Sequence, residues 1–372
     1  MNKNLPKWVD LGLIPLLTLA LAFAVSGLVV LSIGQDPVEV VSVMVKGALC
    51  NPATDSSCFS GIGHTLYFTT NFIFTGLAVA VAFHARLFNI GGEGQAGLAG
   101  VGVALVMLSY NWPHWSIALV VGTLAAMAFG AAWAAIPAYL QAKRGSHIVI
   151  TTIMFNLIAT AIIGYLLVGP MQAEGSLPES ASFPKSAALP TMYDMFGWFG
   201  LAFDKNAPAN ISFVLAIIAA VLVWVLIWKT RLGYEMRAFG HSEKAAVYAG
   251  ISPLKITMIA MLLSGALSGM MAVNTVQGEA ERLLLGSVEG AGFIGIAVAL
   301  MGRSHPVGVV LAAFLFGVLT QGGAELQFAL GIPAEMITVI QALIIMFTGS
   351  LENMVRIPLE KVFIRAGKGV SS

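Results

Sequence analysis

The sequence predicts an all-α integral membrane protein with about ten transmembrane helices, because of its composition, its apolar runs and the placement of its basic residues. Of the 372 residues, 58% are hydrophobic and only 10% are charged, whereas soluble domains average about 25% charged residues. Several apolar runs reach the ~20 residues with which a helix crosses a bilayer. These runs are continuous and do not alternate with polar residues, which favours helices over barrel strands. We therefore predict one transmembrane domain, 1–372.

The predicted spans follow the apolar runs in chain order. The first run is longer than the ~7–15 apolar residues of a signal peptide, so we expect it to be retained as a span. The predicted spans are 11–33, 66–83, 90–109, 115–140, 148–168, 211–228, 256–276, 290–302, 307–322 and 333–349.

The basic residues set the predicted orientation. When the N-terminus is placed in the cytoplasm and the spans alternate, 15 of the 19 Lys and Arg residues fall inside. Short inner loops of membrane proteins are enriched in these residues. The sequence therefore predicts a multi-pass protein of the bacterial inner membrane with cytoplasmic N- and C-termini and a cytoplasmic tail at 350–372. The outer exceptions are Lys46, Lys185, Lys205 and Arg282.

Two long segments are predicted on the outer side, a loop at 34–65 and an insertion at 169–209. The loop holds the only two cysteines, Cys50 and Cys58. A disulfide in an oxidising compartment and two free thiols both remain open for this pair. The insertion is rich in proline and carries an aromatic stretch. We interpret it as an interfacial element beside a docking surface for an extracytoplasmic partner, the alternative being a floppy insertion.

The largest inner segment, 229–255, contains signals for a short helix. Ser242 is a helix-start residue, and Gly250 followed by Pro253 supplies a stop. The pattern predicts a helix over 243–249. Such a helix is either an ordinary loop helix or a knob that fits a groove on another chain.

Polar residues within the predicted spans are candidates for a gate or a solute pathway, since polar groups in lipid carry a cost. The alternative for each is a purely structural role in hydrogen bonding between helices. For Glu93, which lies in the first turn of the third span, the structural alternative is helix capping. No other span has a carboxylate near its middle, which disfavours an ion-coupled secondary transporter. The gate or pathway candidates are Asn71, Asn89, Glu93, Gln95, Asn156 and Asn274.

Several motifs are missing or out of context. No Gly-x-x-x-x-Gly-Lys-Ser/Thr loop occurs, so we expect this chain not to bind ATP by that device. A Gly-x-Gly-x-x-Gly at Gly290, Gly292 and Gly295 opens an apolar span, and we read it, like Gly265 and Gly269, as a close helix contact. No pattern indicates a catalytic residue, a metal site or a nucleic acid polymer as partner. Membrane lipids are the surroundings that the apolar runs imply.

Three motifs carry a resemblance to a known family. They are Arg86-Leu-Phe-Asn-Ile-Gly-Gly-Glu-Gly-Gln95, Arg237-Ala-Phe-Gly-His-Ser-Glu-Lys-Ala-Ala246 followed by Ala249-Gly-Ile251, and the run from Gly290 to Gly302. The sequence resembles the permeases of ABC importers for branched-chain amino acids, simple sugars and nucleosides. Within that family it looks most similar to the nucleoside branch.

The resemblance implies the architecture of type II importers and a set of partners. These are an ATPase chain that binds ATP and Mg, a second permease that is a different, related chain, and an extracytoplasmic solute-binding protein. The segment 229–255 matches the family's coupling helix. The alternatives are a simple sugar or branched-chain amino acid permease, or an ion-coupled secondary transporter. The residues that the resemblance assigns to coupling are Arg237, Gly240, Glu243, Ala245, Ala246 and Gly250.

Overall fold

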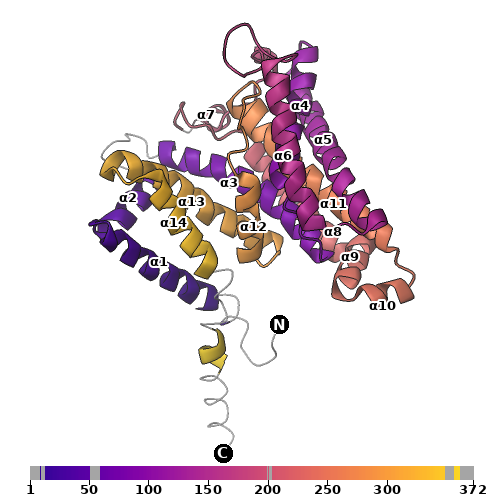
Figure 1. Ribbon diagram of the computed structural model, residues 1–372. Helices are drawn as coiled ribbons and strands as arrows, with labels where there is room; N and C mark the ends of the chain where they lie inside the picture. The colour runs from indigo at the N-terminus through magenta and orange to yellow at the C-terminus, as the bar shows by residue number, and fades with distance from the viewer. Residues whose placement is uncertain are drawn as a thin grey trace, which may run out of the picture. The chain divides into compact units, whose positions relative to one another are not determined.

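The chain folds into helices, as the continuous apolar runs predict (Figure 1). The computed structural model describes Val9 and residues 13–50, 59–198, 200, 203–347 and 356–360. Within these residues there is no β-strand, only isolated bridges at Glu179–Leu284 and Thr191–Asn210. Six described helices are long and apolar enough to cross a membrane, or seven if one bent pair counts as a span. The chain is therefore an all-α multi-pass membrane protein, and the predicted number of about ten spans is not confirmed.

The chain divides into two compact units, residues 1–47 with 321–372 and residues 48–320. The first unit contains α1 (Ile14–Ser32), most of α2 (Pro37–Leu49), the end of α13 (Pro306–Leu330) and α14 (Ala334–Ile345). Helix α1 packs against α14. Gly322 of α13 lies so close to Met44 of α2 that a Cβ on the glycine would meet it.

Helix α2 lies within the segment that the sequence analysis treats as the outer loop 34–65. The side chain of Asp36 accepts a hydrogen bond from the backbone N–H of Val38 at 2.8 Å and so caps the start of the helix. The helix has 13 residues and carries Glu39 and Lys46. It was missed because it is too short and too charged to read as an apolar span.

The second unit is built around α3 (Phe59–His84). Of the 18-residue apolar stretch of this helix, 78% is buried. The buried helix contacts α8, α11 and α12. In the corresponding 18-residue stretches of helices α5, α6 and α8, only 33%, 28% and 33% is buried. Their exposed leucine, isoleucine and valine side chains form the faces that suit a lipid environment. The remaining long helices of this unit are α4 (Gly92–Ser109), α5 (Trp115–Arg144), α6 (Ile148–Val168), α8 (Ser212–Lys229), α11 (Pro253–Gly269) and α12 (Ala291–Met301).

Helices α5 and α11 approach each other through glycine. A Cβ on Gly265 would meet the backbone of Gly130, and one on Gly269 would meet the carbonyl of Ala126. The prediction that Gly265 and Gly269 form a close helix contact is confirmed. The same close approach explains why these two helices share a long interface.

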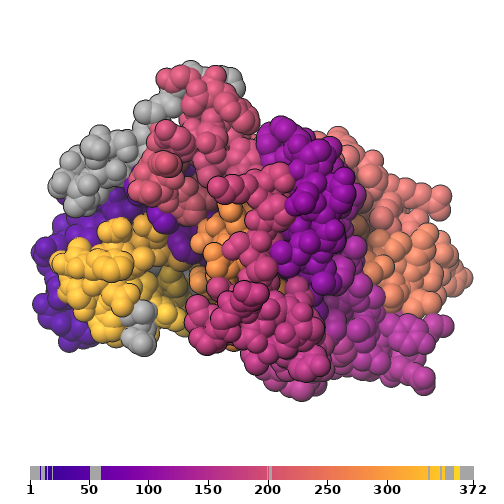
Figure 2. All heavy atoms as spheres, turned by 90° about the horizontal axis from the view of Figure 1, so that it is seen from above, coloured from indigo at the N-terminus to yellow at the C-terminus, as the bar shows by residue number. Residues whose placement is uncertain are grey.

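Short elements lie beyond the two ends of α8. At its beginning, the segment 169–209 holds a 3₁₀ turn, Lys185–Ala187, and α7 (Met192–Gly197). At its end follow α9 (Arg231–His241) and α10 (Glu243–Tyr248). Figure 2 views the first of these ends, where the rose-coloured segment after α6 extends across the helices. These two ends carry the polar and exposed residues described next.

Candidate functional site

The break between α3 and α4 is held by Asn89. Its amide group donates to Gln95 Oε1 at 2.9 Å and to Ser264 Oγ at 2.8 Å. Its amide oxygen accepts from the backbone of Gly91 at 2.9 Å and from Gln95 Nε2 at 3.1 Å. Asn89 and Gln95 are both 1% exposed, so these bonds satisfy groups that water does not reach. The pair thus joins the start of α4 to α11.

Asn156 and Glu93 attach the same break to two further helices. Asn156 of α6 donates to the carbonyl of Ile90 at 2.9 Å and accepts from the N–H of Gly94 at 2.9 Å. The carboxylate of Glu93 accepts from the N–H groups of Gly290 at 2.9 Å and Gly292 at 3.0 Å. Glu93 therefore caps the first turn of α12, whose positive dipole end favours a carboxylate. The sequence analysis placed its capping role on its own helix, and the partner is a different one.

The other predicted pair, Asn71 and Asn274, meets at the middle of α3. Asn274 Nδ2 donates to Asn71 Oδ1 at 2.8 Å and to the carbonyl of Tyr67 at 3.1 Å. Asn274 Oδ1 accepts from Asn210 Nδ2 at 2.9 Å and from Ser212 Oγ at 2.7 Å. Asn274 is fully buried and joins α3 to the start of α8.

Asn274 belongs to a seven-residue π-helix, Val273–Glu279, that follows α11. Such i→i+5 segments are rare and occur frequently at functional sites. The segment also carries Glu279 at its end, and the hydroxyl of Tyr67 interacts with the side chains of both Asn71 and Glu279. A continuous polar chain therefore runs from the start of α8 through the π-helix to α3.

A pocket of about 60 Å³ opens beside this chain. Its polar wall includes Tyr67 and Asn71, and Phe68 and Phe72 supply stacked rings 6.4 Å apart. The hydroxyl of Thr320 is buried in the pocket wall and lacks a hydrogen-bond partner among the described residues. The remaining lining residues are Met271, Ser287, Val288, Glu289, Ala291 and Ile294.

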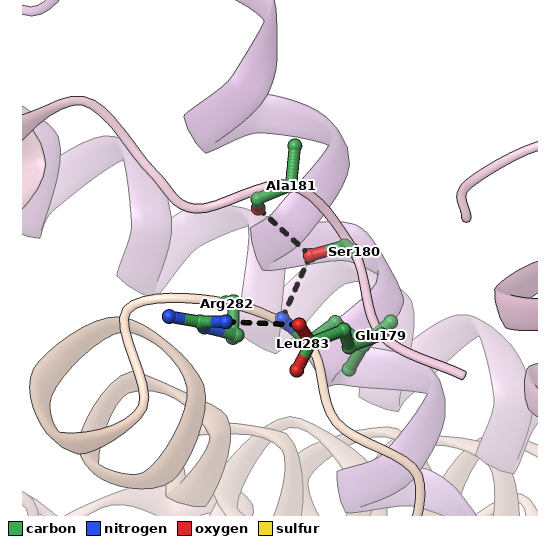
Figure 3. A network of polar contacts seen from close by, with 5 residues as sticks. All are labelled: Glu179, Ser180, Ala181, Arg282 and Leu283. Carbon is green, nitrogen blue, oxygen red and sulfur yellow. Dashed lines mark hydrogen bonds and ion pairs between the residues drawn. The ribbon is translucent and has the colours of Figure 1, made fainter. Parts of the chain in front are cut away.

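The segment 169–209 is tied to the loop that leads to this pocket (Figure 3). Arg282 Nη1 donates to Glu179 Oε1 at 3.0 Å, and the backbone of Leu283 donates to Ser180 Oγ at 2.9 Å. Phe183 N–H donates to the carbonyl of Glu281 at 2.8 Å. These bonds hold residues 179–183 against the loop after the π-helix. The predicted interfacial and docking roles of the segment stay predictions.

The short helix predicted over 243–249 lies beyond the end of α8 and α9. Ser242 Oγ accepts from the N–H of Ala245 at 3.4 Å and caps α10, and Gly250 ends the helix at a φ of +82°. Helix α10 covers Glu243–Tyr248, in agreement with the helix predicted over 243–249. Its exposed side includes Val247 at 49% and Tyr248 at 98% exposure.

The predicted coupling residues do not share one surface. Glu243, Ala245 and Gly250 are exposed, whereas Ala246 is only 3% exposed and packs inward. Gly240 of α9 faces the carbonyl of His84, which a Cβ would strike. Arg237 borders a 550 Å³ pocket between α9 and the end of α3. Glu243, Ala245 and Gly250 are thus the predicted coupling residues that a partner chain could contact directly.

These environments predict different results for two glycine substitutions. Gly240→Ala should lower the melting temperature clearly, because its Cβ collides with backbone of α3. Gly250→Ala meets no atom within 4 Å and should cost only about 1 kcal/mol, from the left-handed backbone. Thermal unfolding in detergent measures both. Equal melting temperatures for the two variants would contradict the packing of α9 on α3.

Some features lie outside what the sequence analysis covered or what the structure describes. Cys58 lies outside the described residues, so the disulfide with Cys50 and the two free thiols both stay open. Tyr67 and Thr320 were not singled out. Tyr67 could have been found, since it lies four residues before Asn71 on one helix face. Thr320 gave no signal, because nothing in its local sequence shows that it faces a polar pocket.

Known proteins are similar to this chain along most of its length. Residues 61–349 match the family described as "Branched-chain amino acid transport system / permease component". The chain is similar to the glucose ABC transporter permease protein TsgB13 of Haloferax volcanii, with 34% identity covering 98% of this chain and 94% of the relative. It is 34% identical to the guanosine ABC transporter permease protein NupP of Bacillus subtilis, over 91% of this chain and 93% of the relative.

Three further permeases are similar to this chain. The nucleoside ABC transporter permease protein NupB of Lactococcus lactis is 32% identical, over 90% of each chain. The same two bacteria have further permeases, NupQ and NupC, that are each 26% identical over 68% and 70% of this chain. The match over most of the chain and the helical membrane fold lead to one conclusion: the chain belongs to the branched-chain amino acid transport system permease component family, and it is a membrane-spanning permease of the ABC transporter type.

Proposed function

We propose that this chain is the translocation subunit of an ATP-driven importer for nucleosides. The observation that carries the proposal is its similarity to the guanosine and nucleoside permeases NupP and NupB, at 34% and 32% identity over at least nine-tenths of each chain. Simple sugars are the second candidate, favoured by the glucose permease TsgB13 at 34% identity.

The architecture that we propose is the type II importer arrangement of about ten helices. The proposal is supported by ten described helices that overlap the predicted apolar runs in sequence, namely α1, α3, α4, α5, α6, α8, α11, α12, α13 and α14. Helix α12 has 11 residues, which at 1.5 Å per residue extend only about 16 Å. We therefore propose that α12 crosses about half of the ~30 Å core and that the 281–290 segment completes its path.

The partners that we propose follow from the absence of a phosphate-binding loop in this chain and from the paired permeases of the relatives. ATP and Mg bind a separate ATPase, and this chain binds no cofactor. The second permease is a different, related chain, as NupP and NupQ both occur in Bacillus subtilis. A solute-binding protein delivers the solute at the outer face. The complex lies in the bacterial inner membrane among lipids, with both termini of this chain in the cytoplasm.

Coupling in this proposal passes through α10. ATP closes the ATPase dimer, the exposed face of α10 moves with it, and the helices change access from outside to inside. The exposed Tyr248 and Val247 at the end of α10 support this part of the proposal. The close packing of Gly240 on the end of α3 would pass the motion to the core.

The test is reconstitution of the complete complex in proteoliposomes with labelled guanosine and with labelled glucose. Guanosine accumulation that requires ATP and the binding protein is the expected result. ATP-dependent glucose accumulation without guanosine uptake would replace nucleosides by sugars. Transport by this chain alone, without ATP, would overturn the importer proposal.

A further inference from the structure

The pocket beside the π-helix combines groups that suit one kind of solute. Tyr67 and Asn71 present a hydroxyl and an amide, and Thr320 adds a hydroxyl without a partner among the described residues. Phe68 and Phe72 add flat apolar surface on the same helix. A neutral molecule with both a flat ring and several hydroxyl groups matches these walls better than an aliphatic or a charged one.

Glu289 gives the pocket its carboxylate. The residue is exposed at the pocket and has a φ of +50°, a left-handed backbone that a non-glycine residue rarely adopts. Strained positions of this kind cluster at ligand sites when the surrounding structure holds them. Here the holding contact is visible, because the next residue, Gly290, donates its N–H to Glu93 at 2.9 Å.

The other side of the same loop is held as well. Phe183 N–H binds the carbonyl of Glu281 at 2.8 Å, and the backbone of Ser180 donates to the carbonyl of Leu283 at 3.0 Å. Leu283 N–H in turn donates to Ser180 Oγ at 2.9 Å (Figure 3). The loop between the π-helix and α12 is therefore fixed before and after Glu289. Holding the backbone at Glu289 lowers the conformational freedom that its carboxylate loses when it binds paired hydroxyl groups.

We propose that this pocket is a contact site for a nucleoside on its way through the permease, in which Glu289 accepts hydrogen bonds from the ribose hydroxyls and Phe68 lies along the base. Carboxylates bind ribose hydroxyls in dinucleotide sites, and bases stack on aromatic rings in many nucleic acid sites. The inference rests on the proposed function and adds to it the residues that recognise the solute. It also gives Glu93 the role of a positioning residue for Glu289.

The small volume of the pocket corresponds to a closed conformation of this site. Its volume of about 60 Å³ is far below the ~300 Å³ or more of pockets that enclose a small molecule. A nucleoside fits only when the walls move apart. An importer requires such a change, since it opens to one side of the membrane at a time.

The test uses two glutamates of the same loop. Glu289 lines the pocket and Glu281 does not, and both are exposed with a φ of +50°. Complete complexes carrying Glu289→Gln or Glu281→Gln are compared with the wild type for uptake of guanosine and of 2′,3′-dideoxyguanosine in proteoliposomes. Glu289→Gln should reduce guanosine uptake about tenfold, because it loses a charge-assisted hydrogen bond. It should reduce dideoxyguanosine uptake much less.

The control and the melting temperature separate this role from a structural one. Glu281→Gln should transport guanosine at the wild-type rate, and both variants should keep the wild-type melting temperature. An equal reduction for both nucleosides, or no reduction for guanosine, would overturn the contact site while leaving the proposed function standing. A wild-type complex that takes up no guanosine would instead overturn the proposed function itself.

Discussion

Asn274→Ala is expected to lower the free energy of unfolding by roughly 2–4 kcal/mol. This is one of the two largest effects that we predict for a single substitution. The side chain is fully buried and binds Asn71, the Tyr67 carbonyl, Asn210 and Ser212. Alanine would leave each of these partners without its bond in a place that water does not reach. The measurement is unfolding of the purified protein in detergent by temperature or by denaturant.

Asn206→Ala is the matched control, because Asn206 is exposed and its side chain has no hydrogen bond among the described residues. Its stability should equal that of the wild type within about 0.5 kcal/mol. Because Asn71 also lines the pocket beside the π-helix, Asn274→Ala should reduce solute uptake even where the protein remains folded. A stable Asn274→Ala protein would show that the polar chain does not organise this end of the unit.

Tyr248→Ala is expected to reduce ATP-driven uptake at least about tenfold, because a buried interface tyrosine commonly contributes 2 kcal/mol or more to binding. Tyr248 is 98% exposed at the end of α10, where it has no role in the folding of this chain. An aromatic side chain left in water at the tip of a helix suits a groove on another chain. The measurements are uptake, and recovery of the ATPase chain in a pull-down with the tagged permease.

The control for this variant is Tyr165→Ala, since Tyr165 is also exposed, at 73%, but belongs to α6. Tyr165→Ala should keep both uptake and ATPase recovery. Both tyrosine variants should melt at the wild-type temperature. If Tyr248→Ala retains full uptake, α10 is not the element through which the ATPase acts.

Local signals predicted the short helix α10 well. Ser242 and Gly250 lie next to the helix that they delimit, so capping and the left-handed stop could be read directly from the sequence. Helix α9 was not predicted, although Thr230 caps it by accepting from Gly233 N–H at 3.1 Å. Its glycines make it a weak helix former, and it is stabilised by packing on the end of α3.

The polar residues of the spans show the limit of sequence reasoning in another way. Their identity as special positions could be predicted, because polar side chains within apolar runs are rare. Their partners could not. Asn89 binds Ser264, and Glu93 binds Gly290, across separations of 175 and 197 residues. The structure thus divides the six candidates into a group that joins α4 to its neighbours and a pair that lies beside the pocket at the π-helix.

The sequence by itself determined that this protein is a helical membrane protein, where its long apolar helices lie and that a short capped helix lies in the loop after the sixth predicted span. Hydropathy and capping depend on residues that are close in the chain, so one sequence suffices for them. The tertiary structure alone decided that α12 is capped by Glu93, that Gly240 faces α3 and that Asn71, Tyr67 and Glu289 line one pocket. These features depend on contacts between distant segments, which form only when the helices pack.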